Sequence, residues 1–405
     1  MEGSMPNEYI IEDIPVAPLK IAAHKSASKL ADEVDSALIS YRKHDYNIIK
    51  EHYSDNLLFR GFAPETFKTR LSCPRFGSGE GKAIFNDSIR GSDVYILCDI
   101  TNYSNTYTLN GFENHMSPDD NYQDLKRIIG ASVASAHRVN VIMPFLYESR
   151  QHKRTQRESL DCALALKELV DMGVSNIITF DAHDPRVQNA IPLTGFDNFL
   201  PTYAFIKALL QRRPDLQISK DSIMIISPDE GAMDRAVYLA NNLGVDVGTF
   251  YKRRDYSKVV GGKNPIVAHE FLGSNVEGKT VVIVDDMISS GESILDTARE
   301  LKERKAKEVV LCATFGLFTS GFDKFDEYHS RGYFDFAITT NLNYRPEAIF
   351  TKPWYIEANM SKYLASIINR FNYDISMSDI IENTDRIQKL INSHKNDYQY
   401  EGSLF

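Results

Sequence analysis

The sequence has few cysteines, and their spacing suggests neither a metal cluster nor a disulfide framework. Cys73, Cys98, Cys162 and Cys312 are scattered over 405 residues, and no two of them form a CxxC pair. This spacing argues against zinc and against a disulfide-stabilised secreted scaffold, and it favours a reducing, cytoplasmic setting. Because free cysteine is among the most buried residue types, we expect each of the four to be a small core residue.

Long apolar runs and basic blocks are also missing. No run approaches the ~18 apolar residues that cross a membrane, and residues 1–13 lack the positive region and apolar core of a secretory signal. The net charge is −9 without a strongly basic block, which argues against general nucleic-acid binding. With 43% hydrophobic and 25% charged residues, the chain is typical of a globular protein of two domains, without a membrane or nucleic-acid partner.

Apolar strand-like runs alternate with amphipathic helical segments along most of the chain. Strands separated by helices indicate βαβ units and parallel sheets. There are too many strands for one small sheet, so we predict an α/β protein with two tandem doubly wound parallel-sheet domains and a boundary near residues 200–220. The predicted strands are 93–100, 139–145, 176–180, 222–228, 247–251, 280–286, 308–315 and 335–340, and the predicted helices include 123–136, 158–173, 232–244 and 293–304.

This pattern predicts an N-terminal domain over residues 1–205 and a C-terminal domain over 206–375. Residues 376–405 are expected to form a final amphipathic helix and tail. Two insertions are expected, one near 45–70, which is hard to assign, and one near 110–120, which looks like a loop. The inward-facing residues of the final helix are expected to be Ile380, Ile381, Ile387 and Leu390.

The stretch "VVIVDDMISSGES" at 281–293 places two carboxylates at the C-terminal end of a buried strand, then hydroxyls and a glycine before a helix. Adjacent carboxylates at a buried strand end are costly without a partner. Asp285 and Asp286 could accept hydrogen bonds from vicinal sugar hydroxyls, while the turn and the helix N-terminus could bind a phosphate. A ribose 5-phosphate has both features, although a plain strand with a polar turn stays open as the alternative. The phosphate-binding candidates are Ser289, Ser290, Gly291 and Ser293.

Two other predicted strands also end in acidic residues. "TFDAHDP" places Asp181 and His183 together, and a carboxylate beside an imidazole suggests a divalent metal, most simply magnesium held partly through water. "ISPDEGAMDRA" places Asp229 in a tight turn before a helix, where it could hold a metal or a sugar hydroxyl. The alternatives are a loop histidine that caps a helix and an N-cap aspartate.

Two basic stretches follow strands as well. Lys252, Arg253 and Arg254 in "FYKRRDYSK" would suit a polyphosphate whose charge shifts during transfer. The other stretch, which includes Arg150, Gln151 and His152, is compatible with a nucleotide phosphate clamp. For each stretch the alternative is a solvated basic segment.

Taken in order, these motifs resemble those of the ribose-phosphate pyrophosphokinase family, also called phosphoribosyl pyrophosphate synthetases. The family order is a G-E pair, an R-Q basic segment, D-x-H, S-P-D-x-G, K-R-R and D-D-M-I. Here it reads "FGSGE", "SRQHKR", "DAH", "SPDEG", "KRR" and "DDMI", over roughly residues 76–345. The closing loop alone is shared with the wider type I phosphoribosyltransferases, so the other five motifs make the distinction.

The resemblance implies a phosphoribosyltransferase-type fold and a transferase of nucleotide biosynthesis. In that reaction the β,γ-diphosphate of ATP passes to the 1-hydroxyl of ribose 5-phosphate, with Mg²⁺ as cofactor, giving phosphoribosyl pyrophosphate and AMP. It also implies a homo-oligomer of dimers, commonly a hexamer, because the adenine-side segment often reaches in from a neighbouring subunit.

The resemblance assigns roles position by position. Lys252 and Arg254 match the catalytic cations, and His183 and Asp229, with Asp181 beside them, match the magnesium-linked residues. The family's ribose-binding carboxylates match Asp285 and Asp286, and its 5-phosphate loop matches Ser289, Ser290, Gly291 and Ser293. Its ATP-binding positions match Phe76, Ser78, Glu80, Arg150, Gln151 and His152.

Several positions depart from the family pattern. The phosphate loop reads "SSGES" where "DTAGT" is more usual, and its Glu292 is expected to point outward from the helix. Ser78, His152, Asp234 and Phe315 also replace common family residues. Two other functions therefore stay open, a non-catalytic regulatory homologue and a phosphoribosyltransferase, although the retained lysine, arginine, histidine and aspartates favour an active pyrophosphokinase.

Overall fold

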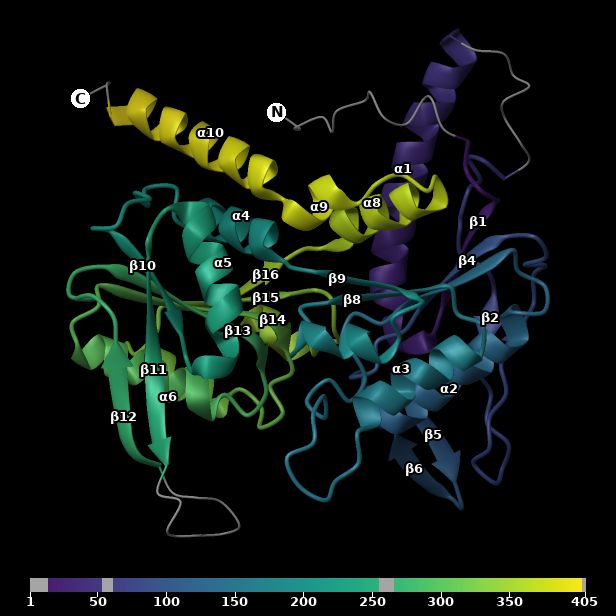
Figure 1. The fold of residues 1–405 in the computed structure, drawn as a ribbon, viewed down its shortest axis with the longest axis horizontal. Coiled ribbons are helices and arrows are strands. Elements are labelled where there is room, and N and C mark those ends of the chain that lie inside the picture. Colours follow the sequence, from purple (N-terminus) through teal and green to yellow (C-terminus); the bar gives the residue numbers. More distant parts are fainter. Residues whose placement is uncertain (1–13, 53–60, 255–265, 403–405) are drawn as a thin grey trace. The chain divides into compact units, whose positions relative to one another are not determined.

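A computed structural model describes the backbone of residues 14–52, 61–254 and 266–402 (Figure 1). Side chains at 48–52, 252–254, 266–269, 379 and 395–402 lie outside that description. The chain folds into two compact units, each built around a largely parallel sheet, so the predicted α/β fold class is confirmed. Unit 1 comprises Met1–Leu200, Asn341–Tyr344 and Met360–Ile381, and unit 2 comprises Pro201–Thr340, Arg345–Asn359 and Glu382–Phe405.

Unit 1 has a fully parallel sheet of five strands in the order β1-β4-β7-β8-β9. Its central strands are apolar on both faces, as expected for a sheet covered by helices on both sides. The strands are β1 (Leu19–Ala23), β4 (Asp93–Leu97), β7 (Arg138–Ile142), β8 (Asn176–Phe180) and β9 (Gly195–Phe199).

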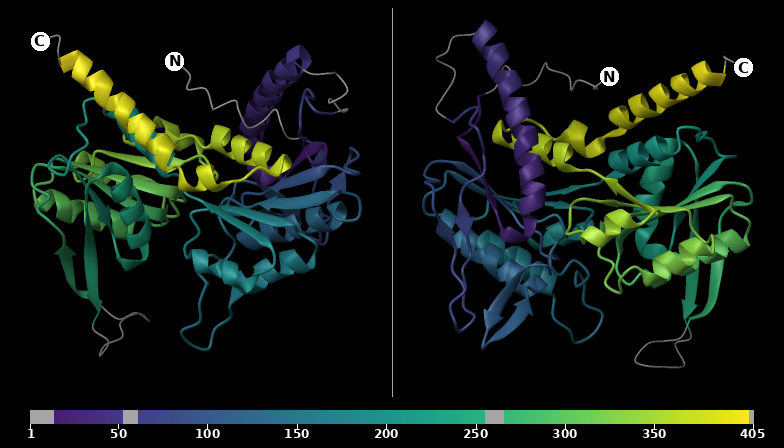
Figure 2. Two further views of the ribbon diagram at one scale, coloured as in Figure 1. Left: turned by 45° about the horizontal axis from the view of Figure 1, so that its top comes forward. Right: turned by 180° about the vertical axis from the view of Figure 1, so that it is seen from behind.

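Helices cover both faces of this sheet (Figures 1 and 2). On one face, α2 (Pro118–Ser132) and α3 (Asp161–Asp171) share a core with alternate residues of the central strands. On the other side of the strands, α1 (Ser28–His52) packs along α8 (Ser361–Asn372). Ser117 caps α2 in a reciprocal capping box with Asp120, which fixes where this helix begins.

Unit 2 has seven strands in the order β12-β11-β10-β13-β14-β15-β16, and only the edge strand β12 runs antiparallel to its neighbour. Ile223 and Ile225 face α4 (Thr202–Arg212) and α5 (Met233–Leu243), whereas Met224 and Ile226 lie in the core beside α6 (Glu292–Glu303) and α7 (Asp323–Ser330). The strands are β10 (Ile223–Ser227), β11 (Asp246–Arg254), β12 (Ile266–Leu272), β13 (Thr280–Ile288), β14 (Glu308–Gly316), β15 (Phe336–Thr340) and β16 (Tyr355–Ala358).

Three expectations about local structure were wrong. The inserted loop near 110–120 is a hairpin of β5 (Thr106–Leu109) and β6 (Phe112–His115), followed by the start of α2. The basic residues 252–254 lie within β11 rather than after a strand. The final helix is two helices, α9 (Ser378–Glu382) and α10 (Thr384–Gly402), because Asn383 between them has a positive φ of 43°. Ile381 is consequently 42% exposed, whereas Ile380 and Ile387 are buried as predicted.

The units also group elements differently from the predicted boundaries at residues 205 and 375. Helix α8 belongs to unit 1 although it follows the last strand of unit 2 in sequence, and α10 packs on α4 and α5 of unit 2. The remaining short elements are β2 (Leu71–Ser72), β3 (Ile84–Phe85), η2 (Lys25–Ala27), η4 (Pro185–Ala190), η5 (Glu230–Ala232) and η6 (Glu347–Thr351).

Cys98, Cys162 and Cys312 are buried and free, as predicted, and Cys73 is free but only half-buried. Across the described helices, none has the length and apolar content that a membrane crossing requires.

Candidate active site

The acidic pair lies at the C-terminal edge of the unit 2 sheet. β13 pairs with β10 only as far as Ile283, whereas its pairing with β14 continues to Ile288. Asp285 and Asp286 therefore lie within β13, beyond the end of its pairing with β10, and β13 continues to Ile288, two residues past the predicted end of the strand at 286. Ligands of open parallel α/β sheets bind at this edge.

The two carboxylates interact with each other and with one cation. The Asp286 N–H donates to Asp285 Oδ1 at 2.9 Å, and the Asp286 residue is only 3% exposed. Burial, with the neighbouring Asp286 charge second, raises the pKa of Asp285 well above its usual range, and Arg235 opposes this rise. Carboxylate oxygens of this kind accept hydrogen bonds from the hydroxyl groups of a ligand.

Arg235 was missed by the sequence analysis. Its Nη1 lies 3.7 Å from Asp285 Oδ1 and 3.4 Å from the Gly231 carbonyl oxygen. Two features of the sequence could have indicated Arg235. It lies one helical turn after Gly231 in the segment that follows β10. The adjacent strands β10 and β13 also end at the same edge of the sheet, which brings this segment near Asp285.

The predicted phosphate loop forms the turn between β13 and α6. Gly291 is the N-cap of α6 with a φ of +84°, and the ring of Phe325 fills the space where a side chain would stand. Ser289 Oγ lies 3.4 Å from Thr319 Oγ1. Ser290 and Ser293 flank the first residues of the helix, whose N–H groups have no partner within the helix. Glu292 is exposed and accepts from Lys324 Nζ at 3.0 Å, so it points outward as predicted.

Asp229 follows β10 and is the N-cap of η5. Its Oδ1 accepts from the Gly231 N–H at 3.0 Å, which is the capping role that the sequence left open. Ser227 Oγ donates to the Asp229 carbonyl oxygen and tightens the same turn. The turn thus orients the carboxylate at the same sheet edge as Asp285.

In unit 1, Asp181 and His183 follow β8. Asp181 is buried and has a positive φ of 40°, a strained conformation that non-glycine residues adopt mainly at functional or tightly constrained positions. The ring of His183 lies 5.3 Å from that of His152, so residues from two separate motifs meet here.

His152 also contacts Asp184, which is not among the predicted site residues. Its Nε2 is 3.5 Å from Asp184 Oδ2, and its Nδ1 is 3.2 Å from the Ser149 carbonyl oxygen. Gln151, expected to contact ATP, donates from Nε2 to the Ser159 carbonyl oxygen at 2.7 Å and so holds its own loop. Arg150 is exposed.

Phe76, Ser78 and Glu80 share one tight loop of unit 1. The Phe76 N–H donates to the Glu80 carbonyl oxygen at 2.7 Å, and Ser78 Oγ donates to Glu80 Oε2 at 2.7 Å. Phe76 is 52% exposed, which leaves its ring accessible for stacking. The side chains of Lys252 and Arg254 lie outside the described residues, so their predicted catalytic role stays a prediction.

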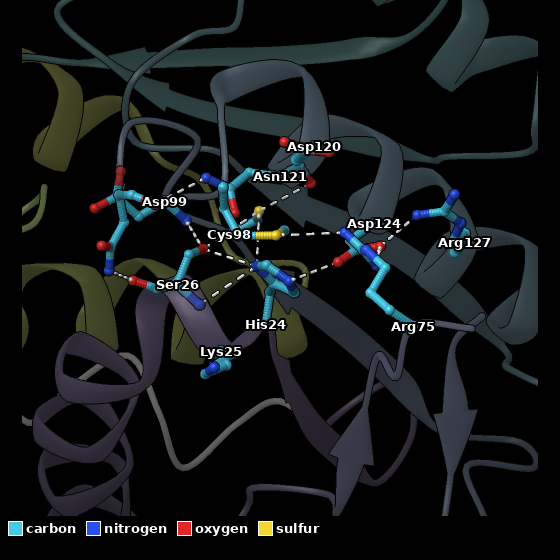
Figure 3. A network of polar contacts seen from close by, with 12 residues as sticks. His24, Lys25, Ser26, Arg75, Cys98, Asp99, Asp120, Asn121, Asp124 and Arg127 are labelled. Atoms are coloured by element: carbon cyan, nitrogen blue, oxygen red, sulfur yellow. Dashed lines mark hydrogen bonds and ion pairs between the residues drawn. The ribbon is translucent and has the colours of Figure 1, made fainter. Parts of the chain in front are cut away.

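The predicted metal ligands come from both units, Asp181 and His183 from unit 1 and Asp229 from unit 2. Among the described residues, the one set of three possible ligands whose atoms lie close together is His24, Cys73 and Asp124. Arg75 and Arg127 already bind the Asp124 carboxylate (Figure 3). Burial raises the pKa of the Cys73 thiol to about 12. Two guanidinium groups and a protonated thiol make this set a poor dication site.

Comparison with known proteins places the chain in a family. Residues 19–173 match the model of the N-terminal domain of ribose phosphate pyrophosphokinase, and residues 202–334 match the phosphoribosyl transferase domain, together more than half of the chain. The chain belongs to the ribose-phosphate pyrophosphokinase family.

Individual relatives agree with this assignment. A ribose-phosphate pyrophosphokinase of Vibrio parahaemolyticus is 29% identical over 314 residues, covering 76% of this chain and 89% of the relative. One from Burkholderia pseudomallei is 31% identical over 256 residues, covering 61% and 70%. The crystal structure of phosphoribosylpyrophosphate synthetase from Mycobacterium smegmatis superposes with a TM-score of 0.65 at 22% identity, over 87% of this chain and 98% of that one, which supports the fold.

Proposed function

We propose that the protein is an active ribose-phosphate diphosphokinase that uses ATP and ribose 5-phosphate. The observation that carries this proposal is the arrangement at the end of β13, where the half-buried Asp285 and the buried Asp286 are followed by a hydroxyl-rich turn and the N-terminus of α6. Membership of the family supports the same reaction.

In this proposal Asp285 and Asp286 accept hydrogen bonds from the two vicinal hydroxyls of the ribose. Ser289, Ser290, Gly291 and Ser293 surround the 5-phosphate, where the N-terminus of α6 favours negative charge. Together these contacts fix the sugar and present its anomeric hydroxyl to the nucleotide.

The anomeric oxygen then attacks the β-phosphorus of ATP. A new bond forms between that oxygen and the β-phosphorus, the bond from the β-phosphorus to the oxygen bridging the α-phosphate breaks, and the hydroxyl proton is released. AMP leaves with the bridging oxygen. Lys252 and Arg254 would stabilise charge on the transferred diphosphate, and positioning supplies most of the rate enhancement.

Magnesium is the proposed cofactor, and the family resemblance assigns Asp181, His183 and Asp229 to it. The carboxylates suit magnesium, because this ion prefers oxygen ligands and keeps several waters. When bound, it would neutralise phosphate charge. On the nucleotide side, Phe76 would stack on adenine, with Ser78, Glu80, Arg150, Gln151 and His152 around the rest of ATP. We further propose a cytoplasmic homo-oligomer, built from dimers as in the family resemblance.

The test is AMP formation by the purified protein with ATP, magnesium and ribose 5-phosphate, against a control without the sugar. Sugar-dependent AMP together with phosphoribosyl pyrophosphate supports the proposal. Binding of ATP or ribose 5-phosphate without AMP would instead favour the regulatory homologue and direct attention to Ser78, His152 and Glu292.

A further inference from the structure

The loop that carries Phe76, Ser78 and Glu80 is closed at its base by Arg75 and Gly81. These two residues form an isolated antiparallel bridge, and the Lys82 N–H donates to the Pro74 carbonyl oxygen at 3.2 Å. The tip of the loop is exposed, whereas the Arg75 side chain is only 10% exposed. The loop therefore has a buried base and an accessible tip.

The buried base is held by Asp124 of α2 (Figure 3). Asp124 is 1% exposed, and its Oδ1 accepts from both Arg75 Nη1 and Arg127 Nη1 at 2.6 Å. Its Oδ2 faces His24 Nε2 at 3.4 Å. Although burial raises the pKa of the Asp124 carboxyl, hydrogen bonds from His24, Arg75 and Arg127 outweigh it and lower that pKa to about 2. Asp124 is thus a charged anchor at neutral pH.

The β5–β6 hairpin and Met116, which follows it, also contact this loop and its base. The Arg75 guanidinium lies 5.3 Å from the centroid of the Tyr107 ring and donates from Nη2 to Met116 Sδ at 3.4 Å. Leu109 packs against Gly79 at the loop tip. Arg75 thus connects three elements, since it lies at the base of the loop and contacts both Asp124 of α2 and Tyr107 of the hairpin.

We propose that Arg75 is a positioning residue, which through Asp124 and Tyr107 holds the loop 76–80 in the conformation that receives the adenine side of ATP. This inference rests on the proposed function, because it gives that loop the nucleotide side of the reaction. In this role Arg75 would act through the loop rather than by contact with either substrate. Its effect should appear in nucleotide affinity and spare ribose 5-phosphate, whose contacts come from β13 and α6.

The test substitutes Arg75→Met and measures the KM for each substrate, the Kd for ATP by calorimetry, and hydrogen exchange of the loop amides. The KM and Kd for ATP should rise about tenfold, while the KM for ribose 5-phosphate stays within about twofold. The amides of Phe76 and Gly79 should exchange faster, because they donate the hydrogen bonds within this loop, to the carbonyl oxygens of Glu80 and Phe76. Arg75→Lys, which keeps the charge, should restore part of the ATP affinity.

Two further variants sharpen the test. Arg70→Met is the matched control, because Arg70 binds Asp87 at 2.6 Å in the same segment but is exposed, so ATP affinity should not change. Gly81→Ala keeps every charge but places a Cβ 2.4 Å from Arg75 Nη1, so it should weaken ATP binding even if Arg75→Met does not fold.

An ATP affinity that stays at the wild-type value in the folded variants, or equal losses for ATP and ribose 5-phosphate, would overturn the inference. Failure of the proposed function is a separate result. If the wild type forms no sugar-dependent AMP yet binds ATP, the Kd and the exchange rates still decide the role of Arg75. If the wild type binds no ATP at all, the inference is overturned as well.

Discussion

The guanidinium of Arg235 faces the acidic pair Asp285 and Asp286, with its Nη1 3.7 Å from Asp285 Oδ1. The two side chains come from neighbouring elements of the same sheet, because Arg235 lies on α5, which follows β10, and Asp285 lies on the adjacent strand β13. A cation at this place compensates the cost of burying two adjacent carboxylates. Arg235 is thereby linked to the site although it belongs to none of the predicted motifs.

Arg235→Met should weaken the binding of ribose 5-phosphate. Because Arg235 opposes the rise in the pKa of Asp285, its loss lets that carboxyl stay protonated to higher pH. We expect the KM for ribose 5-phosphate to rise about tenfold at neutral pH and to recover as the pH is raised. The control is Arg299→Met, which removes an exposed arginine of α6 paired with Asp296. A KM with the wild-type pH dependence would contradict this account.

Gly291→Ala should damage both stability and the phosphate loop. A Cβ at this position would lie 2.4 Å from Phe325 Cζ, and the φ of +84° is itself unfavourable for alanine. We expect a loss of about 2–4 kcal/mol in the free energy of unfolding, and a raised KM for ribose 5-phosphate in any folded fraction. Gly278→Ala is the matched control, because Gly278 has a φ of +76° but open space around its Cβ position, and it should cost about 1 kcal/mol. Equal losses for the two variants in denaturant unfolding would contradict the packing argument.

Lys252→Ala should reduce turnover rather than substrate binding. If Lys252 stabilises charge that develops on the diphosphate, its loss lowers kcat by about 10²–10³-fold while both KM values change little. Lys279→Ala offers a comparison, since Lys279 of the same unit donates to the Lys220 carbonyl oxygen in an exposed turn. Near-normal turnover of Lys252→Ala with saturating substrates would rule out the catalytic role.

The sequence predicted features that depend on short-range patterns. The buried strands, the helix starts and the turn from Asp285 to Ser293 follow from apolar periodicity and from residues with special backbone roles such as Gly291. Arg235, Asp184 and Asp124 were missed because the partners that link them to the predicted motifs, namely Asp285, His152 and Arg75, are distant in sequence. A lone charged residue normally indicates a solvated surface. The break at Asn383 was missed because asparagine only occasionally takes a positive φ.

The stability of unit 1 should depend on pH through Asp45 of α1. Asp45 is buried, and its Oδ2 has no hydrogen-bond partner among the described residues. Burial raises its pKa from 3.8 to about 6, against the opposing charges of Arg42 and His44. Because the folded state holds this proton more tightly, its stabilising effect is complete below pH ~4 and is lost as the pH rises through about 6.

Asp45→Asn, which stays neutral, should therefore raise the free energy of unfolding by about 1–3 kcal/mol at pH 8 and by little at pH 4. Asp32→Asn, an exposed carboxylate on the same helix, is the control for charge alone. Denaturant unfolding of the three proteins at the two pH values measures the effect, and a gain of the same size at both would show that Asp45 does not titrate in this range.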